Sequence, residues 1–416
     1  MKELVDRLVD GEELYLTTQY VEDEVAYKHQ VLMEAEKHGD DEDEDEEEEF
    51  EEEDGECGGF GFGVPPSDNE SLDSIDMNNL KDDFDDLEDD DGIMDETQDE
   101  EVISDGLLGD PLTLSEAQDR VQSLFQRPLS KLFNLPSILP LYPKFFKTLV
   151  PQQINLWMGA TVRNSKEPIL DVNHLGKTLP SSNSTSTGLH HDHADNLYLP
   201  ISGEKRFTLF SPEQAINLYT VGKLNKLFDT GIIDYVKDHE TAPFWKSVRN
   251  DGAILKEVER WELLKQNGEV DESKFNDNDS IDEAEAFLSN GEKKDPPSFS
   301  KIPPSLIHLD EIKDEELLRK MKQLIIEKYP NLLKATSTSV HLKPRQLLYL
   351  PAGWFHEVTS YGNLKDHVHT AVNYWFAPPN QLDDYKNPYQ DSYWRDDFQR
   401  TELSLKYFTE HPEKLF

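Results

Sequence analysis

The sequence predicts a mainly β protein, a barrel or sandwich that carries helical insertions and flanking helices. Runs of β-forming residues occur near the start of the chain, at 154–159 and at 189–210, and again at 346–350, 354–359 and 370–376. A long stretch of helical and loop character lies between these groups. Strands gathered into two groups, without a helix after each strand, argue against a βαβ sheet.

The first elements follow from local composition. Residues 12–24 are rich in Leu, Tyr and Thr, which predicts a strand. Residues 112–150 are apolar but interrupted by prolines, which predicts short helices and turns. Two strand-like runs, 189–201 and 205–210, flank Ser202, Gly203 and Glu204, and this pattern predicts a hairpin.

The second half of the chain contains one clear helix. Residues 313–328 place four apolar side chains on one helical face and are followed by Pro330; these side chains are Leu317, Met321, Leu324 and Ile325. The last residues, 385–416, have an amphipathic pattern.

The whole chain of 416 residues is expected to divide into four parts. Residues 1–37 are the N-terminal part of the fold, 38–110 a disordered acidic insert, 111–378 the core, and 379–416 a helical tail. Within the core, 219–342 is expected to be a helical and loop insertion.

The acidic insert carries most of the net charge of −45, since residues 38–110 hold 34 Asp or Glu and a single basic residue, Lys81. Such a segment buries too little apolar surface to offset its chain entropy, and its charges repel one another. It is interpreted either as a solubilising insert or as an attractor for a basic protein partner. Nucleic acid is an unfavourable partner for this surface because phosphates are bound by clustered Lys and Arg.

Cysteine use and the chain start indicate a compartment. Cys57 is the only cysteine, so no intramolecular disulfide is possible, as is usual in the cytoplasm or nucleus. Met1 is followed by charged residues, without the apolar run of a signal peptide. No segment has the roughly 20 apolar residues of a membrane span.

The densest chemical signal is at residues 187–193, which read Thr-Gly-Leu-His-His-Asp-His. On a strand, residues i and i+2 point to the same face, so His190 and Asp192 project together. His356, in the later strand group, supplies a third candidate ligand. Two histidines and one carboxylate that leave the other metal positions open are the pattern of non-haem Fe(II) oxygenases.

Simpler interpretations exist for each piece alone. An isolated His-x-Asp arises often by chance, and His191 and His193 should point away from His190 by strand alternation. His367 and His369 could form a second metal site, but no ligand-spacing rule supports one. Lys205, fifteen residues after His190, could reach the distal carboxylate of a dicarboxylic cosubstrate.

Taken together, these motifs resemble the jumonji-C (JmjC) oxygenase family, and in particular a branch that contains a lysyl hydroxylase. The resemblance rests on the region of His190 and Asp192, on Gly203 to Phe207, on the Leu-Pro-Ala-Gly-Trp-Phe-His run that ends at His356, and on the Asn-Tyr-Trp at 373–375. It implies a double-stranded β-helix, the cupin or jelly-roll fold. It covers about residues 11–24 and 112–378, with long insertions.

The resemblance also implies the ligands. Fe(II) would be held by His190, Asp192 and His356, and the distal carboxylate of 2-oxoglutarate by Lys205, with O2 as the second cosubstrate. Other residues implied for the cosubstrate pocket are Thr187, Asn196, Asn373 and Tyr15. Tyr15 could equally be a core aromatic of its strand.

Residues expected near the substrate are Tyr198, Trp354 and Trp375, for which core packing is an equal alternative. The chain departs from the family in its short stretch before Tyr15, its acidic insert and its long segment 219–342. The implied function is hydroxylation of a side chain, a lysine by resemblance, on a basic protein. The alternatives are histone demethylation by the same chemistry and a non-catalytic acidic scaffold; a homodimer is also consistent with the family.

Overall fold

The computed structural model describes residues 15–16, 102–103, 111–161, 170–181, 184–237, 241–242, 245–268, 270–271, 274–275, 295–365 and 367–416. The acidic insert therefore lies almost wholly outside the described residues. Among them, no helix has both the length and the hydropathy needed to cross a membrane.

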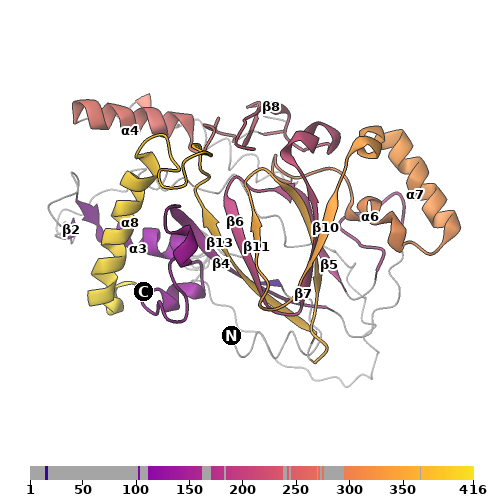
Figure 1. Ribbon diagram of the computed structural model, residues 1–416, viewed down its shortest axis with the longest axis horizontal. Coiled ribbons are helices and arrows are strands. Elements are labelled where there is room, and N and C mark those ends of the chain that lie inside the picture. The colour runs from indigo at the N-terminus through magenta and orange to yellow at the C-terminus, as the bar shows by residue number, and fades with distance from the viewer. Residues whose placement is uncertain are drawn as a thin grey trace, which may run out of the picture. The chain divides into compact units, whose positions relative to one another are not determined.

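Two antiparallel sheets form the core (Figure 1), and the protein is a mainly β, jelly-roll fold. The larger has the order β1-β4-β13-β6-β11: Tyr15–Leu16, Pro151–Ala160, Val368–Phe376, Asp195–Ser202 and Leu348–Leu350. The smaller has the order β10-β7-β12-β5: Thr338–Leu342, Glu204–Phe210, Phe355–Tyr361 and Thr185–His191. Two short pairs, β2 (Val102–Ile103) with β3 (Leu112–Thr113) and β8 (Leu224–Leu227) with β9 (Ile233–Tyr235), lie outside them.

The connection at Gly203 corrects the predicted hairpin. β6 pairs with β11 and β13, whereas β7 pairs with β10 and β12, so residues 202–204 carry the chain from one sheet to the other. Gly203 has φ +73°, and a Cβ there would lie 2.4 Å from Tyr361 O and 2.7 Å from the Cβ of His369. Only glycine fits this close crossing without strain.

Side chains that point between the sheets form an internal cluster with Trp157, Tyr198, Phe207, Leu342 and Val358 among its members. Leu342 belongs to β10, a strand of the smaller sheet at the end of the segment 219–342 that was expected to be an insertion. In its described residues, the rest of that segment holds the β8–β9 pair and the helices α4 (Leu255–Asn267), α6 (Pro304–Ile307) and α7 (Glu315–Lys328).

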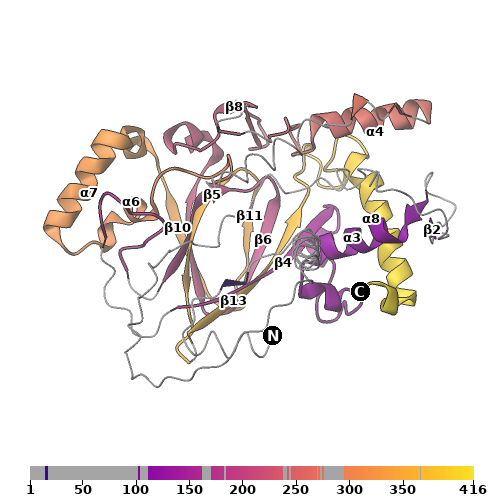
Figure 2. The same ribbon diagram turned by 180° about the vertical axis from the view of Figure 1, so that it is seen from behind.

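Helices cover the outer face of each sheet. α7 begins at its N-cap Asp314, whose carboxylate accepts from the Glu316 and Leu317 amides, and it buries Met321, Leu324 and Ile325 in a cluster with Leu189 and Phe355 of the smaller sheet. The helix predicted at 313–328 is thereby confirmed. Figure 2 shows α6 and α7 on this side and α3 (Leu114–Leu124) and α8 (Tyr393–Glu410) on the side of the larger sheet. Short 3₁₀ turns complete the connections: Leu129–Leu132, Lys144–Phe146, Pro212–Asn217, Leu309–Glu311, Pro330–Lys334 and Pro412–Lys414.

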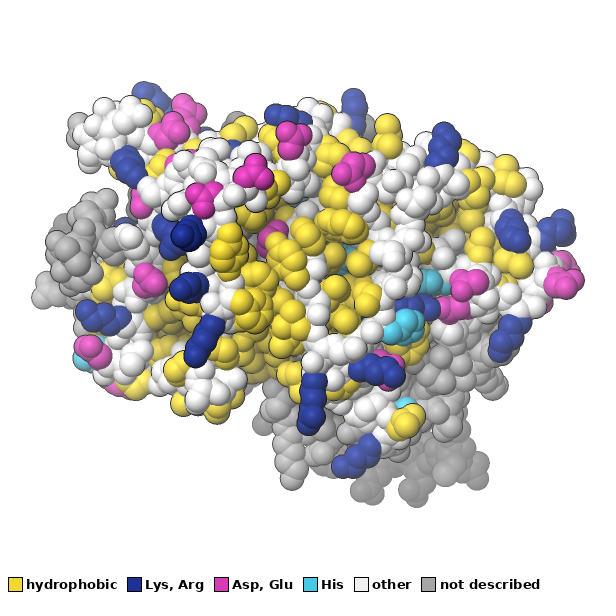
Figure 3. Space-filling model, in the orientation of Figure 1, with side chains coloured by type: hydrophobic (Ala, Val, Ile, Leu, Met, Phe, Trp, Pro, Cys, Tyr) yellow, Lys and Arg dark blue, Asp and Glu magenta, His cyan; other side chains and the backbone are white. Residues whose placement is uncertain are grey.

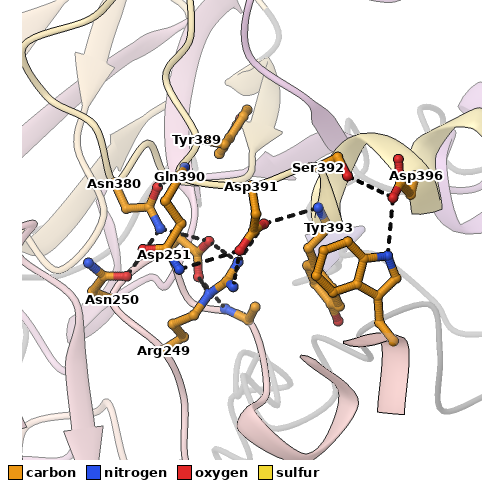
Figure 4. Close-up of polar contacts among 12 residues, drawn as sticks. Arg249, Asn250, Asp251, Asn380, Tyr389, Gln390, Asp391, Ser392, Tyr393 and Asp396 are labelled. Atoms are coloured by element: carbon orange, nitrogen blue, oxygen red, sulfur yellow. Dashed lines mark hydrogen bonds and ion pairs between the residues drawn. The ribbon is translucent and has the colours of Figure 1, made fainter. Parts of the chain in front are cut away.

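A polar network fixes the start of α8 (Figure 4). Arg249 donates to both Asp251 and Asp391, with the shortest nitrogen–oxygen distances at 2.6 Å, and Asp391 also accepts from the Tyr393 amide. Tyr393, Trp394 and Phe398 of α8 then pack in one cluster with the outward side chains of β13. The tail thus belongs to the packed core of the described part.

Candidate metal centre

Three candidate ligands meet where β5 ends and β12 begins. The register of these strands sets His190 opposite His356, and Asp192 follows β5 directly. One ligand atom from each residue lies within 4.8 Å of the others, and all three residues are buried. In the described part of the chain, no second group of three His, Cys, Asp or Glu comes this close.

Backbone carbonyls orient both imidazoles. His190 Nδ1 lies 3.1 Å from Gly188 O, and His356 Nδ1 lies 3.0 Å from Trp354 O. A carbonyl only accepts, so each Nδ1 carries the proton and each Nε2 keeps its lone pair for a metal. Burial, and to a smaller extent the adjacent His356, lowers the pKa of His190 well below its ordinary value, which favours the neutral ring that binds metals.

Asp192 supplies the observation that tests the fit. Its Oδ2 accepts from Asn196 at 3.3 Å and lies 3.7 Å from His356 Nε2, while its buried Oδ1 has no hydrogen-bond partner among the described residues. Burial raises the pKa of this carboxyl. An unsatisfied buried carboxylate oxygen is unfavourable, and a cation between the three side chains would satisfy it. The donor set of two imidazole nitrogens and one carboxylate suits Fe(II).

A line of amides supports Asp192 from the larger sheet. Asn373 donates to Asn196 Oδ1 at 3.0 Å, and Trp157 Nε1 donates to Asn373 Oδ1 at 2.8 Å. Asn196 and Asn373, the residues expected to line the cosubstrate pocket, therefore orient the Asp192 carboxylate. Such outer partners hold a ligand in place and tune it.

Lys205 lies deep inside the barrel, with 1% of its surface exposed. Its Nζ donates to Ser360 Oγ at 2.6 Å and lies 3.2 Å from His369 Nδ1. On β12, Ser360 opposes Lys205 and His356 opposes Leu209, so the two levels are four residues, or about 13 Å, apart on one face of the sheet. Lys205 thus lies inside the same fold as the three candidate metal ligands, but at a different level along β12.

The other two residues expected to bind the cosubstrate are placed less directly. Thr187 on β5 donates to Gly188 O at 3.0 Å and accepts from the Val358 amide at 3.2 Å, so its hydroxyl already serves the backbone. Tyr15 lies opposite Gly159 of β4, whose other neighbour is His369. Its backbone is therefore in the same row as the Lys205 contact, while its side chain lies outside the described residues.

Residues expected near the substrate are divided between core and site. Tyr198 packs edge-on against Phe207 in the cluster between the sheets, and Trp354 packs on that cluster. Trp375 is buried with Ala194 and Phe299. Because the Phe299 ring stacks on His190 with centroids 4.7 Å apart, this last group borders the metal ligands.

Phe299 is a site residue that sequence reasoning missed. The Ser300 amide donates to Leu189 O at 2.8 Å, and the His191 amide to Ser298 O at 3.3 Å, so this segment runs along β5. Nothing in its local sequence marks it, since it follows a polar stretch far from the ligand motifs. The side chain of Lys177 lies over the same ring, its Nζ 5.2 Å from the centroid.

The other histidines considered from the sequence, at 191, 193, 367 and 369, make different contacts. His191 Nε2 meets Tyr235 OH at 2.6 Å and His193 Nε2 meets Ile233 O at 2.8 Å, both on the outer side of the smaller sheet. His367 has φ +62° in the turn before β13, where its carbonyl accepts from the Thr161 amide. His369 contacts Lys205.

Two antiparallel sheets whose interior holds two histidines and a carboxylate, a set compatible with iron binding, are the arrangement of a cupin-type fold. Residues 11–382 match the family described as cupin-like domain, and the chain belongs to this family and is a JmjC domain protein. It is 32% identical over 328 residues to JmjC domain-containing protein 4 of Schizosaccharomyces pombe. That alignment covers 65% of this chain and 63% of the relative, so the chain spans less than two thirds of that protein's length. The family indicates Fe(II)- and 2-oxoglutarate-type oxygenase chemistry.

Proposed function

We propose that the protein is an Fe(II)- and 2-oxoglutarate-dependent dioxygenase that hydroxylates a lysine side chain of a basic protein. The observation that carries the proposal is the buried trio His190, Asp192 and His356, in which Asp192 Oδ1 has no hydrogen-bond partner among the described residues. Lys205 on the same inner face gives a cation for the second carboxylate of the cosubstrate.

Bound Fe(II), 2-oxoglutarate and O2 would supply the oxidising chemistry, in which the cosubstrate becomes succinate and CO2 and a C–H bond becomes C–OH. The protein's own residues would bind these groups and orient them. His190, Asp192 and His356 would hold the metal, Asn196 and Asn373 keep the carboxylate in place, and Lys205 anchors the cosubstrate. The apolar side chains of Phe299, Ala194 and Trp375, which pack beside His190, would keep water away from the reaction.

A protein substrate is supported by charge and by surface chemistry. The net charge of −45 favours encounter with basic partners. Figure 3 shows hydrophobic side chains gathered at the centre of one face, with Lys and Arg around them. Phe145 and Tyr349 are 57% and 40% exposed, and Tyr349 lies on β11, the edge strand that leads toward His356. Exposed apolar groups of this kind often mark protein contacts.

Two other functions are consistent with parts of the molecule. Hydroxylation of an N-methyl group on a histone would remove that group by the same chemistry. An acidic scaffold for basic proteins would need the insert 38–110 but none of the buried ligands, so the intact trio disfavours it. We further propose a cytoplasmic or nuclear location and a homodimer, both open to test by imaging and by light scattering.

The experiment that tests the substrate uses the full chain with Fe(II), 2-oxoglutarate and ascorbate, and mixed histones and ribosomal proteins as probes. We expect about 16 Da to be added to lysines, and none when His356→Ala replaces the wild type. Loss of methyl groups would favour demethylation instead. A chain without residues 38–110 should retain uncoupled conversion of 2-oxoglutarate; if the insert alone binds the probes and nothing is oxidised, the scaffold is the better account.

A further inference from the structure

Lys177 brings a positive charge to the edge of the metal centre. The aliphatic part of its side chain crosses Gly188, two residues before His190. A Cβ at residue 188 would lie 3.3 Å from Lys177 Cε, so glycine leaves room for the lysine. The Lys177 Nζ lies over the ring of Phe299, 5.2 Å from its centroid, and this ring stacks on His190 with centroids 4.7 Å apart. The ammonium and the candidate ligand thus contact the same aromatic ring.

Packing of the neighbouring residues holds the lysine in this place. Leu175, two residues earlier, is 5% exposed and lies in one cluster with Leu189 of β5. The Thr178 amide donates to the Leu175 carbonyl at 3.1 Å and closes a turn around residue 177. Lys177 itself is half-buried. A side chain that is already ordered along its length loses less freedom when its ammonium attracts an anion.

The charge of Lys177 is not neutralised within the part of the chain that the structure describes. There, its ammonium has neither an ion pair nor a hydrogen bond, and its contact is with the Phe299 ring. This is so although the whole chain holds 86 Asp and Glu against 41 Lys and Arg. The charge acts at the metal centre: burial lowers the pKa of His190, and the nearby His356 and Lys177 lower it further.

We infer that Lys177 attracts the anionic cosubstrate to the metal through its charge. 2-Oxoglutarate has two carboxylates, and the proposed function assigns the distal one to Lys205, at a different level inside the fold. Lys177 would act on the other end, the one that binds the metal, so that each end of the dianion meets a cation. The inference rests on the proposed function, because it takes 2-oxoglutarate as the ligand. The same charge would oppose binding of the metal ion itself.

A charge series at residue 177 tests the inference with Mn(II), which allows binding to be measured without turnover. Lys177→Met keeps the aliphatic side chain and removes the charge, whereas Lys177→Glu reverses it. With saturating metal, we expect the Kd of 2-oxoglutarate to rise about threefold in the first variant and about tenfold in the second, as a single charge can do over several ångströms in a half-buried site. Without cosubstrate, the Kd of Mn(II) should fall in the same order. Lys177→Arg should resemble the wild type in both measurements.

A second ligand and a control lysine make the test specific. 2-Oxobutyrate lacks the distal carboxylate and should lose affinity across the series as 2-oxoglutarate does; a loss confined to 2-oxoglutarate would mean that Lys177 does not act at the metal end. Lys226→Met and Lys226→Glu are the matched controls. Lys226 also lies over a phenyl ring, with its Nζ 4.0 Å from the Phe228 centroid, but on β8, outside the two sheets. Both control variants should bind Mn(II) and 2-oxoglutarate as the wild type does.

Opposite effects on a cation and an anion are the signature of charge, since a merely structural role of Lys177 would weaken both. Affinities for Mn(II) and 2-oxoglutarate that change in the same direction, or that stay constant across the series, would therefore overturn the inference and leave the proposed function intact. Absence of 2-oxoglutarate binding in the wild type would refute the proposed function, and the inference with it.

Discussion

Asn196 donates a hydrogen bond to Asp192 Oδ2 over 3.3 Å, and the buried Oδ1 of the same carboxylate has no hydrogen-bond partner among the described residues. One oxygen is therefore oriented by the protein and the other is left for a ligand. Asn373 donates to Asn196, and Trp157 donates to Asn373. The orientation of the Asp192 carboxylate is therefore set both by its place at the end of β5 and by hydrogen bonds from the larger sheet.

Loss of this support should weaken the metal site. Asn196→Ala is expected to reduce metal affinity by roughly 10- to 100-fold, the usual cost of losing an outer partner of a ligand. Titration of Mn(II) into the purified protein measures it. Asn173→Ala, at an exposed turn, serves as the control and should leave the affinity as in the wild type. Equal affinity in both variants would show that Asn196 does not orient Asp192.

Gly203 should tolerate no side chain. Gly203→Ala is expected to lower the free energy of unfolding by about 2 kcal/mol or more, because the new Cβ meets backbone at 2.4 Å as well as His369. Gly268→Ala has a similar φ, +77°, but nothing within 4 Å of its Cβ, so it should show only the backbone cost of about 1 kcal/mol. Urea unfolding gives the comparison. Similar losses at the two positions would mean that the crossing between the sheets is looser than described.

Glu357, the residue after the candidate ligand His356, contacts the helical segment that covers the smaller sheet. Glu357, fully buried, accepts from Ser186 at 2.5 Å and lies 2.8 Å from His308 Nε2 at the end of α6. His308→Leu removes the imidazole partner of this buried carboxylate and should cost about 2 kcal/mol of stability. His174→Leu breaks a matched contact with Asp171 at the surface, and its unfolding curve should overlay that of the wild type. A stable His308→Leu variant would contradict this reading.

Asp195 should make stability depend on pH. Burial raises its pKa to about 6 from an ordinary 3.8, although Tyr349 and the Ala352 amide donate to it. The folded protein therefore holds this proton more tightly than the unfolded chain, and stability falls as pH rises from about 4 through about 6.

The variant that isolates this effect is Asp195→Asn, which cannot ionise. Relative to the wild type, the free energy of unfolding of this variant should increase between pH 5 and pH 7. The full change over the whole titration is about 3 kcal/mol. A fixed, pH-independent loss of stability is expected as well. The new side-chain NH2 group will face one of the two donors, Tyr349 OH and the Ala352 amide, that the carboxylate accepts from. Asp384→Asn, at an exposed position, should show no such trend over this range. A difference in unfolding free energy between Asp195→Asn and the wild type that does not change with pH would show that the Asp195 carboxyl lies in a more polar environment.

Short-range patterns predicted much of this molecule. The ligand motif at 190–192 lies within three residues, so its geometry follows from the local backbone, and the helix at 313–328 follows from its apolar face. The hairpin at Gly203 was wrong because alternating strands joined by a glycine turn look the same whether they pair or separate into two sheets. Ser360 and Phe299 were not predicted, and His369 was considered only for a second metal site, since their contacts join segments about 100 or more residues apart in the chain.

The most direct test of the account is the formation of succinate from 2-oxoglutarate by the full chain with Fe(II) and ascorbate. We predict turnover in the wild type, its loss in His190→Ala and Lys205→Ala, and normal rates in His174→Leu. Turnover that persists without His190 would show that the metal lies elsewhere. No succinate, together with no Fe(II)-dependent binding of 2-oxoglutarate, would contradict the oxygenase assignment.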